Sequence, residues 1–175
     1  MAMPEEEIEI PEGVEVKMEG GRVEVSGPKG TVYRTFNLRD IQLRMEGRRI
    51  RISSPSEKRR VKAMIGTIKA HLRNAFKGVT QGFVYKLKIV YSHFPITVKV
   101  EGDRVTIHNL LGEKVPRVAK IMGRAQVRVV GDEIIVEGVD KEEVGQTALN
   151  IEQASRVKGR DPRVFQDGCY LFERG

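Results

Sequence analysis

Four cationic side chains near the C-terminus are the residues of this sequence best placed to do chemistry, and that chemistry is anion binding. They fall within eight positions: Arg156, Lys158, Arg160 and Arg163. Gly159 and Asp161–Pro162 interrupt any helical face here, so we expect irregular backbone. Arginine forks bind phosphates bidentately and lysines act as point charges. Segment 153–175 is therefore predicted to dock on nucleic acid; the alternative is an ordinary solvated C-terminus with a short edge strand.

Three aromatic residues follow the cations: Phe165, Tyr170 and Phe172. Two uses are open for Tyr170 and Phe165. Each ring either stacks on a base or anchors the segment to its own domain.

No catalytic or metal-binding constellation is visible in the sequence. His71, His93 and His108 lack the spacing of metal ligands and have no cysteine nearby. Carboxylates lie in solvated runs such as Glu5–Glu7, which argues against a tuned acid–base pair. The glycines of Gly27–Gly30 lack Walker spacing and are predicted to form a hairpin turn. We therefore predict no enzyme, no cofactor, no metal site and no small-molecule substrate.

Composition favours a polyanionic partner and a reducing compartment. The chain has 175 residues, 31 Lys and Arg against 24 Asp and Glu, and a net charge of +7, which points to nucleic acid or another acidic surface. A single cysteine, Cys169, excludes an internal disulfide framework. Apolar runs are too short to cross a bilayer, and the first residues do not resemble a secretory signal. We expect a cytoplasmic protein with no membrane partner.

Hydrophobic spacing predicts that strands are followed by a helix, twice. Residues 1–54 alternate apolar and polar positions between glycine-containing turns, the pattern of antiparallel strands. After Ser56, the predicted N-cap, apolar residues recur at three and four positions and predict a helix that ends at Gly78. The cycle then repeats and ends in a second helix, capped by Asp140 with Glu143 placed as in a capping box.

The two halves match each other in sequence pattern. Val23–Val25 corresponds to Val105–Ile107, 82 positions later, and Ile50–Ile52 corresponds to Ile134–Val136, 84 positions later. An insertion of about two residues reconciles the two offsets, which indicates an internal duplication.

We therefore predict an α+β fold of two duplicated domains, residues 1–80 and 81–175, each an antiparallel β-sheet packed against one main α-helix. The helices differ in charge: residues 56–77 carry a net +6 and residues 140–155 a net −3. Because the second helix would repel a polyanion, the second domain is expected to bind through its loops and tail. The basic first helix is a secondary candidate.

The C-terminal segment resembles the archaeal and eukaryotic branch of ribosomal protein L-six, whose signature spans a glutamine, cations, an Asp-Gly pair and a tyrosine. The matching positions here are Gln153, Val157, Arg160, Arg163, Phe165, Asp167, Gly168, Cys169, Tyr170, Leu171 and Arg174. Only Cys169 departs, in place of an aliphatic residue, and a free cysteine behaves as a small hydrophobe. A second similarity is Asn109–Arg117, which looks like the family's hairpin loop.

The resemblance implies a structural protein of the large ribosomal subunit that supports translation in the cytoplasm. Its expected partners are large-subunit (23S-type) rRNA and neighbouring ribosomal proteins. In the family, this region lies near the stalk base and the sarcin–ricin loop, where translational GTPases dock.

The predicted RNA-binding residues are Arg156, Lys158, Arg160, Arg163, Lys114, Arg117 and Tyr170. The alternative function is a free-standing RNA-binding or RNA-chaperone module outside the ribosome.

Overall fold

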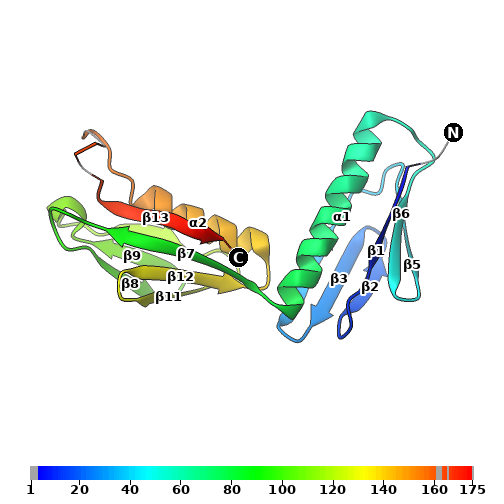
Figure 1. The fold of residues 1–175 in the computed structure, drawn as a ribbon, viewed down its shortest axis with the longest axis horizontal. Helices are drawn as coiled ribbons and strands as arrows, with labels where there is room; N and C mark the ends of the chain where they lie inside the picture. The colour runs from blue at the N-terminus through cyan, green and yellow to red at the C-terminus, as the bar shows by residue number, and fades with distance from the viewer. Residues whose placement is uncertain (1–3, 161–162, 165, 175) are drawn as a thin grey trace. The chain divides into compact units, whose positions relative to one another are not determined.

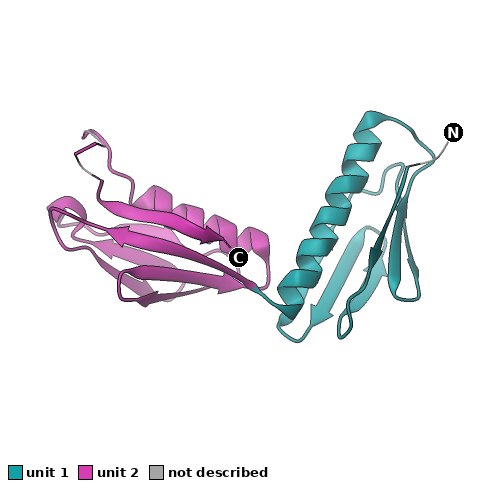
Figure 2. Cartoon of the chain, viewed as in Figure 1, with its two compact units in different colours: residues 1–82 teal, residues 83–175 magenta. Residues whose placement is uncertain are grey.

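The chain forms two compact units, residues 1–82 and 83–175 (Figure 2). The structure is a computed structural model that describes residues 4–160, 163–164 and 166–174. Each unit combines antiparallel strands with one long helix, so the predicted α+β fold of two repeated halves is confirmed. The observed division falls between Gly82 and Phe83, whereas the sequence placed it between residues 80 and 81.

In the described part of unit 1, six strands precede one helix (Figure 1). The strands are β1 (Glu5–Glu9), β2 (Glu15–Glu19), β3 (Arg22–Gly27), β4 (Gly30–Thr35), β5 (Gln42–Glu46) and β6 (Arg49–Ser53), and the helix is α1 (Arg59–Thr80). The strands form two antiparallel sheets, in the orders β2-β3-β4 and β1-β6-β5. Alternation within each strand did not reveal this division into two sheets.

Helix α1 covers the apolar faces of both sheets in unit 1. Its buried side chains include Val61, Ile65, Ile68, Leu72 and Phe76, at the helical spacing of three and four. The helix contacts β1, β3, β4 and β6. The predicted Gly27–Gly30 turn closes the β3–β4 hairpin and packs on the end of this helix: Lys29 N–H donates to the Val79 carbonyl at 2.8 Å.

Both predicted ends of α1 were wrong. The N-cap is Lys58, without a side-chain cap, and the Ser56 hydroxyl instead accepts a hydrogen bond from Lys58 N–H at 3.3 Å in the preceding turn. The helix continues past Gly78 to Thr80 because the left-handed residue that ends it is Gly82, at φ 78°. Gly82 N–H donates to the carbonyls of Lys77 and Gly78 and so closes the last turn.

Unit 2 repeats this plan and adds a strand. Its elements are β7 (Phe83–Val90), β8 (Thr97–Glu101), β9 (Arg104–His108), the 3-10 turn η1 (Leu110–Gly112), β10 (Arg117–Lys120), β11 (Gln126–Val130), β12 (Glu133–Gly138), α2 (Lys141–Ala154) and β13 (Gly168–Arg174). The sheets are β10-β9-β8 and β11-β12-β7-β13, all antiparallel. The predicted cap of α2 is confirmed: Asp140 Oδ1 accepts a hydrogen bond from Glu142 N–H at 2.9 Å.

The core of unit 2 joins both sheets to α2. Phe83, Leu87, Ile107, Ile134 and Ile151 are each at most 2% exposed and belong to one apolar cluster. The added strand β13 pairs with β7 and contributes the buried Cys169 to this cluster. The C-terminal segment therefore ends in a strand that is part of the folded domain (Figure 1).

Candidate nucleic-acid interface

The predicted cations lie on one loop that leaves α2 and returns as β13. We call residues 155–167 the basic loop. Arg156, Lys158, Arg160 and Arg163 are all exposed on it. Asp161, Pro162 and Phe165 lie outside the described residues, so stacking and anchoring both stay predictions for the Phe165 ring. The loop connects α2 to β13, so the cations lie on a segment that is attached to the folded domain on both sides.

Arg117 fastens the start of the basic loop. Its Nη1 donates to the carbonyl of Ala154 at 3.2 Å and to the carbonyl of Arg156. Its Nε and Nη2 donate to the two carboxylate oxygens of Glu113 at 3.0 and 2.9 Å. This guanidinium, which the sequence predicted to bind RNA, thus lies beside the predicted tail and makes four hydrogen bonds within the chain.

Electrostatics support this arrangement. The hydrogen bond from Arg117 is the main reason that the pKa of Glu113 is lowered, and the positive charge of Arg160 also contributes. The same hydrogen bond raises the pKa of Arg117. The negative charge of Glu113 is therefore stabilised by Arg117 at the end of the Asn109–Arg117 loop and by Arg160 on the basic loop.

Asp167 fastens the end of the basic loop. Its carboxylate is fully buried and accepts hydrogen bonds from Ser92 N–H at 3.4 Å and Ser92 Oγ at 3.3 Å, and its Oδ1 lies 3.1 Å from His93 Nδ1. Burial alone would raise the pKa of Asp167, but the hydrogen bonds with His93 and the backbone of Ser92 and His93 outweigh it, and the pKa is lowered. Asp167 thus ties the basic loop to the segment that follows β7.

The two ends of the basic loop also meet each other. Ser155 Oγ accepts a hydrogen bond from Cys169 N–H at 2.9 Å. A Cβ at Gly168 would lie 3.0 Å from the Ser155 carbonyl oxygen, so a larger residue at this position would crowd the Ser155 backbone. The Tyr170 hydroxyl, predicted either to stack or to anchor, donates to the Gln166 carbonyl at 3.0 Å, although 44% of the residue is exposed. That bond fits an anchoring role for its hydroxyl.

Three loops gather at one end of unit 2: residues 91–96, 109–116 and the basic loop (Figure 1). Asp167 joins the first to the basic loop. Asn109 Nδ2 donates to the Pro95 carbonyl at 3.0 Å and joins the first to the second. Lys114 is exposed on the second loop, whose backbone is held by the buried Leu110. The predicted site residues are therefore brought together on one surface.

Sequence reasoning missed the segment 91–96 as part of this surface. Tyr91 and Phe94 are 50% and 46% exposed there. Their signal in the sequence is the run Tyr-Ser-His-Phe-Pro directly after a strand, in which two aromatic residues flank His93. The sequence pattern drew attention only to His93, and only as a histidine without metal-ligand spacing.

Comparison with known proteins bears on both units. The family model of ribosomal protein L6 matches residues 10–82 and 94–168. The chain belongs to the ribosomal protein L6 family. One matched segment lies in each unit, in keeping with the repeated halves of the fold.

Three archaeal relatives support the same L6 assignment, and each bears the name large ribosomal subunit protein uL6. The protein of Aeropyrum pernix is 53% identical over 170 residues, which cover 97% of this chain and 93% of the relative. That of Methanobrevibacter smithii is 51% identical over 169 residues, covering 97% and 95%. That of Methanosarcina mazei is 49% identical over 167 residues, covering 95% of each.

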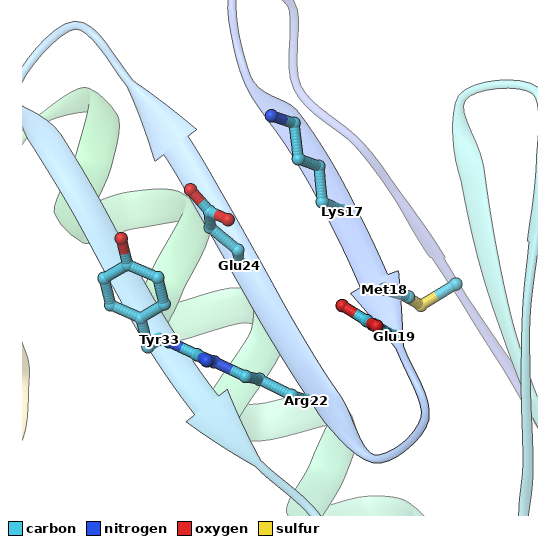
Figure 3. Close-up of a pocket in the computed structure, with 6 residues that line it drawn as sticks. All are labelled: Lys17, Met18, Glu19, Arg22, Glu24 and Tyr33. Carbon is cyan, nitrogen blue, oxygen red and sulfur yellow. The ribbon is translucent and has the colours of Figure 1, made fainter.

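A hollow on unit 1 of this L6 protein differs in character from the surface formed by the three loops of unit 2. It has a volume of about 410 Å³ and lies over β2, β3 and β4 (Figure 3). Its lining carries both signs of charge: Lys17, Met18, Glu19, Arg22, Glu24 and Tyr33. The guanidinium of Arg22 stands 4.9 Å from the centre of the Tyr33 ring. Because the lining carries both signs of charge and selects no one kind of partner, we assign the hollow no ligand.

Within residues 4–160, 163–164 and 166–174, no group of three or more His, Cys, Asp or Glu side chains could hold a metal ion. No helix in the described part of the chain is long and apolar enough to span a membrane.

Proposed function

We propose that this L6 family member is a structural protein of the large ribosomal subunit that binds large-subunit rRNA through the basic loop and the loop 109–116 of unit 2. Its relatives are named as proteins of that subunit. The observation that carries the proposal is the exposure of four cations on a loop that is held at both ends. A loop fixed in this way presents its charges to phosphates with little further loss of conformational entropy.

The mechanism is positioning, without a chemical step. Arg156, Lys158, Arg160 and Arg163 contact phosphates, and Lys114 adds a charge from the neighbouring loop. Arg117, which the sequence predicted to bind RNA directly, contributes in this proposal by holding the carbonyls of Ala154 and Arg156 at the start of the basic loop. The family resemblance supports a location near the stalk base and the sarcin–ricin loop, close to docked translational GTPases and beside other ribosomal proteins.

Matched charge neutralisation tests the proposal. In one variant Lys158, Arg160 and Arg163 are replaced by Gln; in its control Arg59, Lys62 and Arg73, exposed on α1, are replaced likewise. Both lose three positive charges. Binding to a transcript of the large-subunit rRNA is measured between low and moderate salt. The loop variant should lose affinity, and the slope of log affinity against log salt should fall by about 1 per lost phosphate contact.

Two results would contradict the proposal: a loop variant that binds like the wild type, or an α1 variant that loses as much. A free-standing RNA chaperone is the alternative, and co-sedimentation separates the two functions. A ribosomal protein stays with the large subunit, near one copy per particle, through washes in moderate salt. A chaperone is washed away.

A further inference from the structure

The aromatic loop, residues 91–96, carries two half-exposed rings and is bonded to both the basic loop and the loop 109–116. Tyr91 is 50% exposed and Phe94 is 46% exposed. Their loop is bonded to the basic loop through Asp167 and to the loop 109–116 through Asn109. Large apolar side chains that remain this exposed on a folded domain are usually covered by a partner when clustered.

The Phe94 ring is supported from one side. A Cβ built at Gly112, where φ is 75°, would lie 3.4 Å from both Cε2 and Cζ of Phe94. The ring therefore packs close to the Gly112 backbone, while almost half of the residue stays open to solvent. A ring that is held in this way is preorganised to receive a flat partner on its open side.

Charge selects the kind of partner. Two carboxylates of these loops, Glu113 and Asp167, are engaged by Arg117 and by the Ser92–His93 pair. The two neighbouring loops carry exposed cations: Lys114 on the loop 109–116 and Arg156, Lys158, Arg160 and Arg163 on the basic loop. Cations beside open aromatic rings suit a single-stranded nucleic acid, whose phosphates and bases need both. An acidic protein would use the cations and leave the rings without a planar partner.

We propose that the aromatic loop is a base-stacking element, in which Phe94 and Tyr91 receive unpaired rRNA bases while the basic loop holds the adjacent phosphates. This rests on the proposed function and extends it: the aromatic loop binds unstacked bases of the rRNA, in addition to the phosphates that the basic loop binds. The rings supply contacts that do not depend on salt, whereas the cations supply those that do.

Ring removal tests this with a matched control. Phe94→Leu and Tyr91→Leu keep an apolar side chain and remove the aromatic face; Tyr33→Leu does the same at a residue that is 47% exposed on unit 1. Affinity for the large-subunit rRNA transcript should fall about tenfold for each loop variant, with the salt slope unchanged. Tyr33→Leu should bind like the wild type. Thermal unfolding monitors the fold of all three.

A second measurement keeps the ring and observes the contact directly. The chain contains no tryptophan, so Phe94→Trp introduces a single tryptophan, whose emission can be excited apart from that of the tyrosines and should be quenched by stacking on a base when the rRNA is added. Unquenched emission in a variant that still binds, or wild-type affinity in both leucine variants, overturns the stacking proposal while the salt-dependent function stands. If those leucine variants bind rRNA normally but fail to enter the large subunit, the rings contact a protein and the proposal is wrong. If the wild-type protein shows no salt-dependent binding to the rRNA transcript, both proposals are wrong.

Discussion

At the scale of single residues, Arg117 and Asp167 fasten the two ends of the basic loop by different means. Arg117 acts from the surface, with hydrogen bonds to the carbonyls of Ala154 and Arg156. Asp167 acts from the interior, where its carboxylate has no exposed area and accepts from Ser92. Both are expected to act on RNA binding by placing the cations, a role in which geometry counts more than charge.

Asp167→Asn should destabilise unit 2 near neutral pH by about 1 to 3 kcal/mol, because the amide cannot accept all the bonds that the carboxylate does. The pKa of Asp167 is lowered in the folded state, so the unfolded state binds the proton more readily in acid. The stabilising contribution is therefore complete above the unfolded pKa of about 3.9, and is lost as the pH falls through the lower folded pKa. Denaturant unfolding from pH 7 to about pH 2 should show the gap between wild type and variant closing in acid. A constant gap would contradict this role.

Arg117→Lys keeps the positive charge but cannot form the fork with Glu113 while holding two carbonyls. We expect faster hydrogen exchange at the backbone amides of residues 156–160, and rRNA binding weakened severalfold with little change in the salt slope. Lys114→Gln is the comparison: it should lower the slope and leave exchange in the basic loop unchanged. Unaltered exchange in Arg117→Lys would show that the guanidinium does not hold the loop.

At the scale of elements, β13 is the addition that distinguishes unit 2 from unit 1. It pairs with β7 from Gly168 to Arg174, with an irregularity between Leu171 and Glu173. Docking of this strand returns the basic loop to the body of the domain and buries Cys169 at 1% exposure. The sole thiol of the chain therefore reports whether the strand is in place.

Cys169 should resist thiol reagents in the native protein. Burial raises the pKa of its thiol to about 11, although a hydrogen bond with Ser155 opposes the shift. At pH 8, reaction with an aromatic disulfide reagent should be at least about 100-fold slower than in denaturant, where the thiolate fraction is ordinary and access is complete. Equal rates in the two conditions would mean that β13 is not docked as described.

The N-termini of α1 and α2 differ in capping, so we expect side-chain removal at Ser56 and at Asp140 to change the free energy of unfolding by different amounts. Asp140→Ala removes a side-chain cap and should lower the free energy of unfolding by about 1 kcal/mol. Ser56→Ala lies outside α1, whose N-cap is Lys58, and should cost less than half of that. Denaturant unfolding of both variants checks the pair. A larger loss for Ser56→Ala would mean that its hydroxyl caps α1 after all.

At the scale of the whole molecule, hydrophobic periodicity predicted the repeated strands and helices because the burial pattern of a strand or helix depends on residues close together in sequence. The sequence also identified the exposed cations of the basic loop. It could not predict the contacts that hold this loop, since Arg117 reaches Ala154 across 37 positions and Asp167 reaches Ser92 across 75. Such pairs depend on how sheets and loops close in space. For the same reason the aromatic loop, far from the cations in sequence, was not connected with them.

A density map of the native large ribosomal subunit at side-chain resolution tests the central claim most directly. We predict rRNA phosphates within hydrogen-bonding distance of at least two of Lys158, Arg160 and Arg163, with Arg117 still holding the carbonyls at the start of the basic loop. A map in which the basic loop faces solvent or only protein, while rRNA lies along the cations of α1, would contradict the account.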